Sequence, residues 1–388
     1  MTAEAQDTDV IVVGAGPVGL FLAGDLRARG TRVTVLERLD RPTTESRAST
    51  LHARTMEILA ERGLLERFGE LPGGGTGHFG GIPLDLTAAD PGHPLAGQWK
   101  CPQTRIEAVL HQWATDLGAR VLRGHTVDGL LQEEHRVRVT ARTADGAVRT
   151  FTATHLVGCD GEDSAVRRLA GFELGGHAAT VEMLRADVAG LDIPDRRFER
   201  HPEGMATSYR WPDGTTRVMV HLHGHTPEPR SGEPDFAEIV TAWARTTGED
   251  ISGGSPLWLN AFDDASFQTT RYLIGRVLLA GDAAHIQMPV GGMALNLGLQ
   301  DAAELGPILA AHTTGAEDRS PLDDYDERRA VGARTLTHIA AQARLLLGGP
   351  EVDALRTVFG ELLGLDAVRG HLARTIVGLP VRPASTPS

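Results

Sequence analysis

The sequence predicts an α/β fold in which a Rossmann-like dinucleotide-binding domain is interrupted by a β-rich domain and completed by long C-terminal helices. A glycine turn, GAGPVG at residues 14–19, lies between an apolar strand and a helix. Helical periodicity gives way to alternating segments from about residue 172 to 272, and a buried strand returns at 276–285. We therefore expect the dinucleotide-binding domain in two parts, 1–171 and 273–388, around a β-rich domain at 172–272.

The first part opens with a strand–turn–helix–strand unit. Residues 9–13 (DVIVV) form the first strand, residues 20–29 have helical spacing, and a second strand at 32–37 ends in Glu37. This unit closes as βαβ, so the sheet is expected to be parallel. Further helices are predicted at 54–68 and 105–117, and further strands at 120–123, 126–131, 136–141 and 149–157.

The remaining elements follow the change from helical periodicity to alternation at about residue 172. Alternating segments such as TTRVMVHLHG at 215–224 predict an antiparallel sheet. The strand in 276–285 runs into a turn, a helix follows from about residue 292, and two long helical patterns cover about 322–347 and 351–363. A second G-x-G-x-x-G match at 75–80 follows no predicted strand and opens no helix, so we interpret it as a loop.

Composition excludes several classes of protein. The chain has 388 residues, a net charge of −13 and two separated cysteines, Cys101 and Cys159, which argues against nucleic-acid binding, a disulfide scaffold and a thiolate metal site. One of the 38 basic residues is a lysine, Lys100, which disfavours lysine-nucleophile chemistry. Residues 1–9 lack the features of a secretion signal, and apolar runs are too short to span a membrane. We expect a cytoplasmic protein without membrane partners.

The glycine turn has the spacing needed to hold a pyrophosphate. Gly14 permits the tight bend, Gly16 lets the backbone approach the phosphates, and Gly19 allows the helix to pack closely on the strand. The amide groups and the dipole of the following helix then face the phosphates. Glu37, after the second strand, is positioned to accept hydrogen bonds from ribose hydroxyls.

Three motifs in a fixed order carry a resemblance to a known family: GAGPVG at 14–19 with Glu37-Arg38, GCDGEDSAVR at 158–167, and AGDAAHIQMPVGGMALNLGLQDA at 280–302. Together they resemble the class A flavoprotein monooxygenases, the single-component aromatic hydroxylases that include para-hydroxybenzoate hydroxylase. Segments 46–59, 77–86 and 102–110 are similar to the subgroup that hydroxylates aromatic polyketides such as angucyclines and anthracyclines. The resemblance covers nearly the whole chain.

The resemblance implies FAD as cofactor, NADPH or NADH as electron donor and O2 as co-substrate. Asp282 would accept a hydrogen bond from a ribityl hydroxyl, and the amides at 289–296 would face the flavin pyrimidine edge, where negative charge gathers on reduction. Asp160 and Gly161 match a motif that contacts FAD and influences nicotinamide binding. The implied cofactor contacts are Gly14, Gly16, Pro17, Val18, Gly19, Glu37, Arg38, Arg47, Gln103, Arg105, Val127, Asp160, Gly161, Asp282, Pro289, Gly292, Met293 and Asn296.

The activity implied is hydroxylation of a polycyclic aromatic polyketide through a flavin C4a-hydroperoxide, so catalytic side chains are left unassigned. The β-rich domain would supply the substrate contacts, for which Tyr209, Arg210, His221 and His223 are candidates. Two features depart from the subgroup. Met293 and Ala294 stand where many members have Gln-Gly, and the chain ends shortly after GLPVRP at 378–383, without the thioredoxin-like domain of larger members.

Several alternatives remain open from the sequence. Baeyer–Villiger oxygenation could use the same scaffold, and a flavin-binding accessory protein or a dehydrogenase would transfer no oxygen. A flavin halogenase is disfavoured because its WxWxIP segment is absent, and no G-x-S-x-G elbow indicates a hydrolase. His221, His223 and His225 alternate, but no acidic or cysteine cluster completes a site, so no metal is predicted. The oligomeric state is left open.

Overall fold

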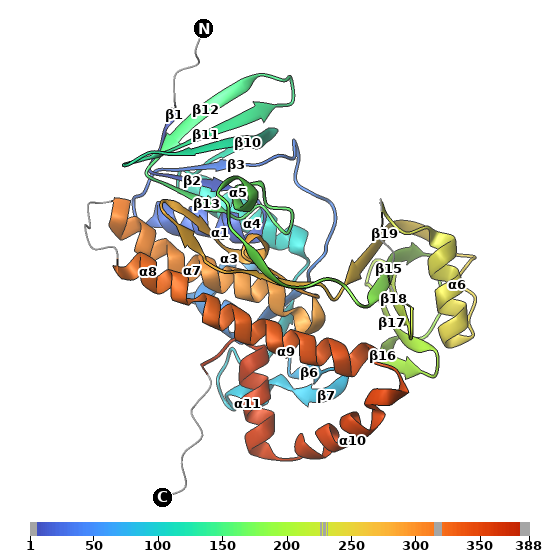
Figure 1. The fold of residues 1–388 in the computed structure, drawn as a ribbon. Coiled ribbons are helices and arrows are strands. Elements are labelled where there is room, and N and C mark those ends of the chain that lie inside the picture. Colours follow the sequence, from blue (N-terminus) through green and yellow to red (C-terminus); the bar gives the residue numbers. More distant parts are fainter. Residues whose placement is uncertain (1–5, 226, 228–229, 231, 314–319, 381–388) are drawn as a thin grey trace, which may run out of the picture.

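The computed structural model describes residues 6–225, 227, 230, 232–313 and 320–380. Its centre is a sheet with the strand order β21–β22–β13–β2–β3–β9, in which β21 alone runs antiparallel to its neighbour. Figure 1 shows β13, β2 and β3 of this sheet side by side. The strands are β2 (Val10–Val13), β3 (Val33–Leu36), β9 (Arg120–Leu122), β13 (His155–Gly158), β21 (Leu273–Ile274) and β22 (Val277–Leu279). Apolar residues run without alternation along β2 and β22, as expected for strands buried on both faces.

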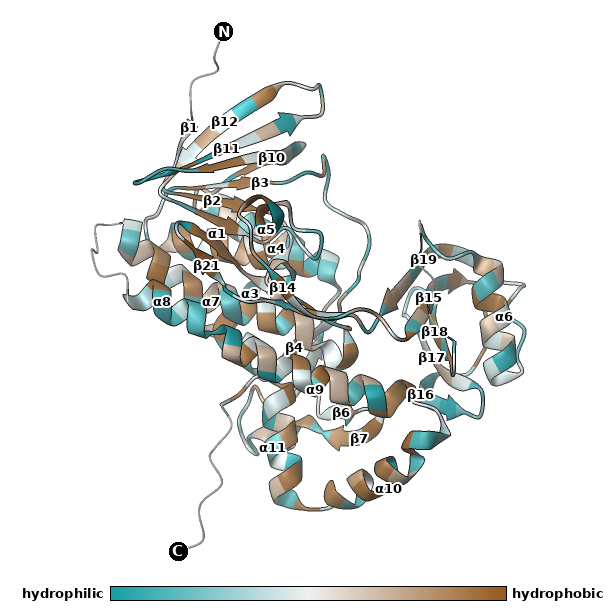
Figure 2. Cartoon of the chain, viewed as in Figure 1, coloured by the Kyte–Doolittle hydropathy of each residue, from teal (hydrophilic) through white to brown (hydrophobic). Residues whose placement is uncertain are grey.

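Helices cover one face of this sheet and a second sheet covers the other. The helices are α1 (Pro17–Ala28), α4 (Gln103–Asp116) and α7 (Met293–Thr313), and the second sheet is β1 (Gln6–Asp7), β12 (Val148–Ala153), β11 (Val137–Thr143) and β10 (His125–Gln132). Both layers belong to one hydrophobic core, to which Ile11, Phe21 and Val139 contribute. Figure 2 shows the hydrophobic colouring of the central strands and of α1. The predicted fold class is confirmed.

Two predicted elements are each divided in the structure. The helix predicted at 54–68 is α2 (Ala53–Glu61) followed by α3 (Leu65–Phe68), because Gly63 has φ +65° and ends the first helix. The strand predicted at 149–157 is β12 and β13, which belong to different sheets. Thr154 separates them, and its hydroxyl donates to the carbonyl of Asp9 over 2.6 Å.

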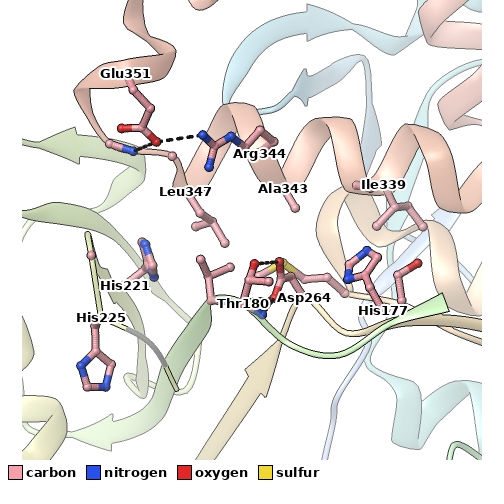
Figure 3. Close-up of a pocket in the computed structure, with 17 residues that line it drawn as sticks. His177, Thr180, His221, His225, Asp264, Ile339, Ala343, Arg344, Leu347 and Glu351 are labelled. Atoms are coloured by element: carbon pink, nitrogen blue, oxygen red, sulfur yellow. Dashed lines mark hydrogen bonds and ion pairs between the residues drawn. The ribbon is translucent and has the colours of Figure 1, made fainter. Parts of the chain in front are cut away.

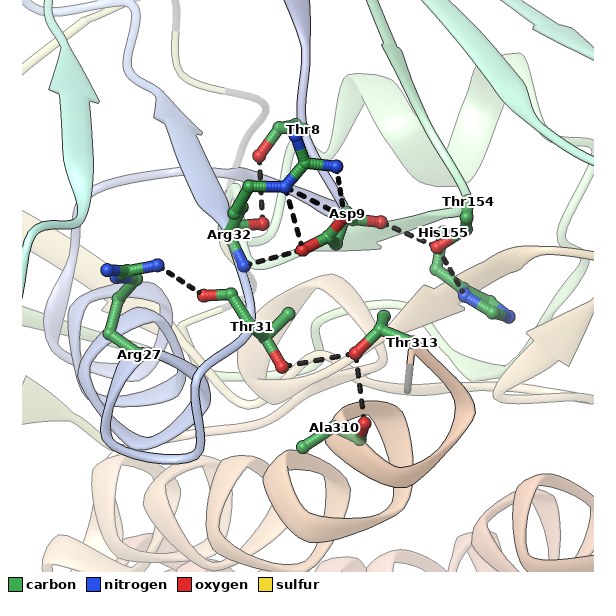
Figure 4. A network of polar contacts seen from close by, with 9 residues as sticks. All are labelled: Thr8, Asp9, Arg27, Thr31, Arg32, Thr154, His155, Ala310 and Thr313. Atoms are coloured by element: carbon green, nitrogen blue, oxygen red, sulfur yellow. Dashed lines mark hydrogen bonds and ion pairs between the residues drawn. The ribbon is translucent and has the colours of Figure 1, made fainter. Parts of the chain in front are cut away.

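Polar contacts join the elements at the amino end of the central sheet (Figure 4). Asp9 pairs with the Arg32 guanidinium at 2.6 Å and also accepts from the Arg32 amide at 2.8 Å. The hydroxyls of Thr31 and Thr313 lie 3.1 Å apart, which connects the loop before β3 to the end of α7. These contacts occupy the amino edge, so the carboxyl edge is the one available for ligands.

The β-rich segment contains an antiparallel sheet in the order β16–β17–β18–β15–β19. Its strands are β15 (Glu182–Ala189), β16 (Arg196–His201), β17 (Gly204–Arg210), β18 (Thr216–Leu222) and β19 (Ser255–Asp263). One face packs against α6 (Phe236–Thr247), a helix that the sequence analysis did not predict. The Asp235 carboxylate caps α6 by accepting from the amide of Ala237, and this is a standard helix-start signal.

Three small sheets connect the larger layers. They are β14 (Leu174–His177) with β20 (Ser266–Thr269) and β23 (His285–Ile286); β4 (Thr50–His52) with β8 (Gln98–Lys100) and β5 (Gly73–Gly74); and β6 (Thr76–Phe79) with β7 (Ile82–Asp85), followed by the 3-10 helix Leu86–Ala89. The interpretation of residues 75–80 as a loop is wrong in detail, because Thr76–Phe79 is a strand that pairs with Ile82–Asp85 in a hairpin. It still opens no helix.

The C-terminal region is helical, with one more break than predicted. The pattern at 322–347 divides into α8 (Ser320–Glu327) and α9 (Arg329–Leu347), and the segment 351–363 contains α10 (Asp353–Leu362); α11 (Asp366–Ile376) was not predicted. Short 3-10 helices lie at Gly281–Ala283, Val290–Gly292 and Pro350–Val352, and α5 at Ala165–Leu169. Among the described residues, none of the helices has both the length and the apolar character of a membrane span. Residues 381–383 of the GLPVRP segment lie outside the described part.

Candidate active site

Three chain turns meet at the carboxyl edge of the parallel sheet. They follow the neighbouring strands β2, β13 and β22, as the motif order predicts. A Cβ placed on Gly14 would lie 2.3 Å from the carbonyl oxygen of Cys159, and one placed on Gly281 would lie 3.1 Å from Val18. The turns are therefore in direct contact, and we expect the cofactor cleft at this edge of the sheet.

The glycine turn fits the space that a pyrophosphate needs. Gly14 has φ +102°, and a Cβ on Gly19 would lie 2.1 Å from the carbonyl oxygen of Gly14, so both positions require glycine. Gly16 differs, because a Cβ there would meet nothing within 4 Å. It precedes α1 without a side-chain cap, and Pro17 occupies the first turn. The first amides of α1 thus face an open space, as in a helix N-terminus that binds phosphate.

Glu37 lies beside this turn, whereas Arg38 is exposed next to it. The Glu37 carboxylate is 9% exposed and accepts from the amides of Ala15 at 2.7 Å and Leu39 at 2.8 Å. Each carboxylate oxygen has a second lone pair, so these contacts leave capacity for ribose hydroxyls. The structure places Glu37 where the predicted role requires it, and the role itself stays a prediction.

Asp282 follows β22, and its side chain is exposed at the carboxyl edge of the sheet. The side chain has exposed surface, yet loss of hydration raises the pKa of its carboxyl group, and this combination is typical of a group in a recess. The charges of His285 and Arg47 oppose that rise, so Arg47 lies near the same recess although it comes from another segment. Arg47 also pairs with Glu45 at 3.2 Å. The sequence analysis placed Asp282 and Arg47 at the cofactor, and the structure brings them together.

Gln103 holds the loop that carries Arg47. Its side-chain oxygen accepts from the amide of Ala48 at 3.1 Å, and its backbone amide donates to the hydroxyl of Ser46 at 3.0 Å. Arg105 points elsewhere, because it donates to the carbonyl of Phe68 at the end of α3. Gln103 is therefore placed to position Arg47, whereas the guanidinium of Arg105 is held by α3.

The other predicted FAD residues shape the protein around the cleft. Asp160 accepts from the hydroxyl of Ser164 at 2.5 Å and from the amide of Val166 at 3.1 Å, so its side chain caps α5, and burial raises its pKa. Gly161 follows with φ +80°. Val127 is buried in β10, where the pairing register shifts before Gly129.

The 289–296 loop begins with two left-handed glycines and ends inside α7. Gly291 and Gly292 have φ of +69° and +70°. The buried Asn296 amide accepts from the His52 backbone at 2.8 Å and donates to the carbonyls of Thr50 at 3.0 Å and Gly292 at 2.7 Å. Its side chain therefore fastens the loop to β4, which leaves the backbone amides of the loop as the groups that could meet a flavin.

Met293 and Pro289 differ in their surroundings. Pro289 is exposed to the cleft edge, whereas Met293 is 3% exposed and its sulfur accepts from the side-chain amide of Gln342 at 3.3 Å. Gln342 belongs to α9 and is fully buried. At position 293, this chain has an apolar methionine where many members of the subgroup have a polar glutamine. Gln342 of α9 contacts that methionine.

A buried charged triad lies directly behind Asp282. Asp301 accepts from Nε2 of His285 at 2.7 Å, from Nε of Arg328 at 2.6 Å and from the amide of Gly281 at 3.1 Å. Burial alone would lower the pKa of His285, but the charge of Asp301 outweighs it and raises that pKa. Burial alone would raise the pKa of Asp301, but His285 and Arg328 hold it below its usual value. The sequence analysis missed this triad.

A cavity of about 400 Å³ lies between α9 and the β-rich segment (Figure 3). Its lining includes the apolar residues Val181, Met288, Ile339 and Leu347 and the polar residues His177, Thr180, His221, Asp264, Arg344 and Glu351. Met288 precedes Pro289, so the cavity reaches the loop described above. Of the substrate candidates, His221 lines this cavity, and Nδ1 of His223 lies 3.1 Å from the carbonyl of Leu347 at its edge.

The other two substrate candidates lie apart from this cavity. Tyr209 is 50% exposed at the end of β17 and packs edge-on against Trp211. The side chain of Arg210 donates to the carbonyl of Leu191 at 2.7 Å. The structure therefore brings two of the four candidates to the cavity. In the described part of the chain, no group of three histidine, cysteine or acidic side chains is arranged to hold a metal ion.

Sequence reasoning missed the sheet face that lies opposite the loop. Alternate residues of β15 pack against α6, and the others, with their neighbours on β17, β18 and β19, face the second hydrophobic cluster. Five of the seven methionines gather there: Met183, Met205, Met219, Met288 and Met293. A polarizable, adaptable methionine wall suits a flat aromatic ligand. Strand alternation could have indicated Met183 and Arg185, but only the fold brings them to Met288.

Arg185 is a buried cation of this face, and an aromatic pair covers it. Its guanidinium lies 4.5 Å from the Trp258 ring centre and 5.1 Å from that of Phe262, and it donates to the side-chain oxygen of Asn260 at 2.8 Å. Burial, followed by the charge of Arg217, lowers the pKa of Arg185 to about 9. It also reaches the carbonyl of Arg47 at 3.4 Å, which connects the sheet to the cofactor cleft.

Comparison with known proteins agrees with this geometry. The model of the FAD binding domain family matches residues 7–340. The chain is 40% identical over 385 residues to rifampicin monooxygenase of Streptomyces venezuelae, covering 96% of this chain and 79% of that protein. The structure of CabE, an aromatic hydroxylase from angucycline biosynthesis, superposes with a TM-score of 0.93 at 44% identity, covering 97% of this chain and 77% of that one.

A third relative has a different reaction in its name. Dialkyldecalin synthase of Streptomyces rugosporus is 36% identical over 379 residues, covering 95% of this chain and 80% of that protein. The chain belongs to the FAD-binding family of class A aromatic hydroxylases. It is a flavoprotein monooxygenase, and the enzymes of this class use FAD, NAD(P)H and O2. The resemblance predicted from the sequence is confirmed.

We expect the Asp282→Ala variant to bind FAD about ten- to hundred-fold more weakly than the parent, because a hydrogen bond to a charged group contributes roughly 1.5–3 kcal/mol. Fluorescence titration of the deflavinated protein with FAD measures this. Asp192→Ala, which removes a fully exposed carboxylate, is the matched control and should titrate like the parent. Equal affinity in Asp282→Ala and the parent would remove the assignment.

Proposed function

We propose that the protein hydroxylates a polycyclic aromatic polyketide with FAD, NAD(P)H and O2. The observation that carries the proposal is the convergence of the turns after β2, β13 and β22 at one edge of the parallel sheet. The cavity that Met288 lines lies beside the loop that follows β22. The likeness to CabE supports the substrate class. FAD, when bound, supplies the activation of dioxygen, and the chain supplies binding, orientation and the exclusion of water.

Each segment of the cleft has a proposed task toward FAD. The amides of Gly16 and the start of α1 bind the pyrophosphate, and the Glu37 carboxylate accepts hydrogen bonds from the ribose hydroxyls. Asp282 accepts a ribityl hydroxyl. The amides of the 289–296 loop and the positive end of α7 face the pyrimidine edge and stabilise negative charge there. Glu37 already accepts two backbone amides and would use its remaining lone pairs, whereas within the described residues the other tasks fall to groups without a side-chain partner.

We further propose that the β-rich domain, residues 172–272, forms the wall against which the substrate lies, between the two parts of the FAD-binding domain, 1–171 and 273–388. Of the methionine wall, Met288 lines the cavity, and the buried Met183, Met205 and Met293 pack behind it and keep water out of that side. A dry wall next to the flavin favours oxygen transfer to the ring over release of hydrogen peroxide. With a net charge of −13, the protein acts on a small molecule in the cytoplasm and not on nucleic acid.

The test is the coupling between NADPH oxidation, oxygen consumption and peroxide release in the presence of hydroxylated tetracyclic quinones. We expect a substrate to accelerate NADPH oxidation and to lower the fraction of oxygen recovered as peroxide, with a product that has gained one oxygen atom. NADPH oxidation that no aromatic compound stimulates, with all oxygen recovered as peroxide, would contradict the proposal.

Two other reactions fit the same scaffold. Baeyer–Villiger oxygenation also adds one oxygen, so carbon NMR of the product decides, because a new lactone carbon excludes simple hydroxylation. A reaction without oxygen transfer is favoured by the likeness to dialkyldecalin synthase. In that case the product forms at the same rate under anaerobic conditions without NADPH.

A further inference from the structure

Three nitrogen-bearing side chains from three strands gather beside the 289–296 loop: Lys100 at the end of β8, Arg197 on β16 and His78 on β6. We call them the β8–β16 cluster. The carbonyl of Thr76 on β6 joins the three strands, because it accepts from Arg197 at 3.0 Å and from the side chain of Gln98, two residues before Lys100 on β8. The charges of Arg197 and Lys100 both act on His78, which agrees with this arrangement. Lys100 is the only lysine of the chain. Within the described residues, neither cation is paired with a carboxylate.

Lys100 reaches the loop through one residue. Its ammonium group donates to the hydroxyl of Thr50 at 2.8 Å. Thr50 lies against Gly292, since a Cβ on Gly292 would be 3.0 Å from the Cβ of Thr50, and its carbonyl accepts from Asn296. The ammonium group is therefore placed beside the part of the cleft where the flavin ring and the substrate meet in the proposed function.

The surroundings of Lys100 match those of Asp282. Lys100 has exposed surface, yet loss of hydration, and then the charge of Arg197, lower its pKa. A side chain with both properties lies in the wall of a recess. Arg197 is exposed as well, so both cations are accessible, and an anionic ligand would supply the opposite charge that the surrounding side chains do not. In a chain with a net charge of −13, a cation kept apart from carboxylates indicates such a ligand.

The backbone at Arg197 is distorted in a way that aims its side chain. The pairing of β16 with β17 shifts register between Arg196 and Glu199. Phe198 has φ +52°, and no other non-glycine residue in the described ranges has a positive φ. Its ring lies 4.3 Å from that of His78, and Arg197 donates to the carbonyl of Thr76 at 3.0 Å. Bulges and strained residues of this kind redirect side chains next to binding sites.

His78 completes the cluster as a neutral donor. Its Nδ1 accepts from the amide of Gly81 at 3.1 Å, so the proton of the neutral ring is on Nε2. Burial, with the charges of Arg197 and Lys100, lowers the pKa of His78 to about 4. The neighbouring His52 is neutral too, because burial and Lys100 lower its pKa to about 3. The cluster thus presents two positive charges and one N–H group, and no group that could accept a proton from them at neutral pH.

We propose that the β8–β16 cluster binds an ionised hydroxyl oxygen, a phenolate or enolate, of the polycyclic substrate. This inference rests on the proposed function and specifies the form in which the substrate binds. Ring hydroxyl groups that are conjugated with a quinone carbonyl, but not hydrogen-bonded to it, are acidic. An ionised ring is more electron-rich and therefore a better acceptor of electrophilic oxygen. Lys100 and Arg197 hold the anion, and His78 donates the third hydrogen bond.

The experiment uses 1,2-dihydroxyanthraquinone as a probe, because its visible spectrum changes when it ionises. The FAD-loaded protein is titrated with the probe, and the pH at which the bound probe ionises is measured. We expect Lys100→Met to bind it roughly ten- to hundred-fold more weakly and to raise the ionisation pH of the bound probe by about one unit or more. Lys100→Arg should restore most of the pH shift, and Arg197→Met should act in the same direction.

The control is Arg142→Met, which removes an exposed cation paired with Asp128 on β11 and should leave both readouts unchanged. Unchanged affinity and ionisation pH in Lys100→Met and Arg197→Met, at the same FAD content, would overturn the inference. If the only change in these two variants is a higher KM for NADPH, the inference is overturned as well, because the cluster would then bind a phosphate of the nucleotide. The affinity for the probe and the pH at which the bound probe ionises are both measured without turnover. A protein that does not hydroxylate would therefore contradict the proposed function, but it would not contradict the anion site.

Discussion

Replacing Asp301 by alanine is expected to lower the free energy of unfolding by about 3–5 kcal/mol, because it leaves the buried His285 without its carboxylate partner and leaves Arg328 with Glu304 alone. His285 is fully buried, and Arg328 is 6% exposed, so neither can turn to water. The amide of Gly281 also loses its acceptor. Denaturant unfolding at saturating FAD and without FAD measures the loss. Asp324→Ala, at an exposed site on α8, is the control and should change stability by no more than about 0.5 kcal/mol.

The pH dependence of the same triad follows from the two pKa shifts. The folded pKa of His285 lies above its ordinary value of 6.5, so its contribution is complete below that pH and is lost as pH rises through the folded value. The folded pKa of Asp301 lies below 3.8, so its contribution is present above that pH and is lost in acid. The stability difference between the parent and His285→Gln should therefore shrink as pH rises above 6.5. A constant difference would contradict the charged state of His285.

Gly16→Ala is expected to weaken FAD binding without unfolding the protein. A Cβ at this position meets no protein atom within 4 Å and φ is −77°, so the change should alter the stability of the apoprotein by less than about 1 kcal/mol. The same Cβ would occupy the space of the pyrophosphate, and steric costs of roughly 1–3 kcal/mol predict a ten- to hundred-fold loss of affinity. Flavin fluorescence titration and thermal unfolding, run side by side, separate the two effects.

Gly19→Ala is the contrasting variant, because its Cβ would lie 2.1 Å from the carbonyl oxygen of Gly14. We expect this change to destabilise the apoprotein itself by about 1–3 kcal/mol or more, in the absence of any cofactor. If Gly16→Ala unfolds as readily as Gly19→Ala, or binds FAD like the parent, the open space at Gly16 does not belong to a phosphate site.

The parts of the site that the sequence predicted are those where backbone geometry demands particular residues. Gly14 and Gly19 can be assigned because the turn between a strand and a helix tolerates no side chain there. The order of the three motifs was sufficient to place Asp160 and Asp282 at one edge of the sheet. A family resemblance added the cofactor, which no spacing within the chain specifies.

The rest depends on contacts between distant segments. The sequence alone assigns no binding role to Lys100. Its proposed role depends on Thr50 and Arg197, which the fold brings beside it. The triad of His285, Asp301 and Arg328 joins three elements, so no local pattern reveals it. The break between β12 and β13 was missed because both strands are apolar and Thr154 is itself compatible with a strand. The α6 helix was not predicted because its segment lies between segments with the alternating pattern of strands.

The middle of the central sheet is assembled from strands that are far apart along the chain. Leu156 of β13 pairs with Val277 of β22, and the whole β-rich sheet is synthesised between them. Loop closure over this length makes the pairing a late, non-local step of folding. The ribosome must therefore release more than two thirds of the polypeptide before a nucleotide pocket can exist. Supply of the vitamin-derived cofactor should then affect the yield of native enzyme only late in translation or after it.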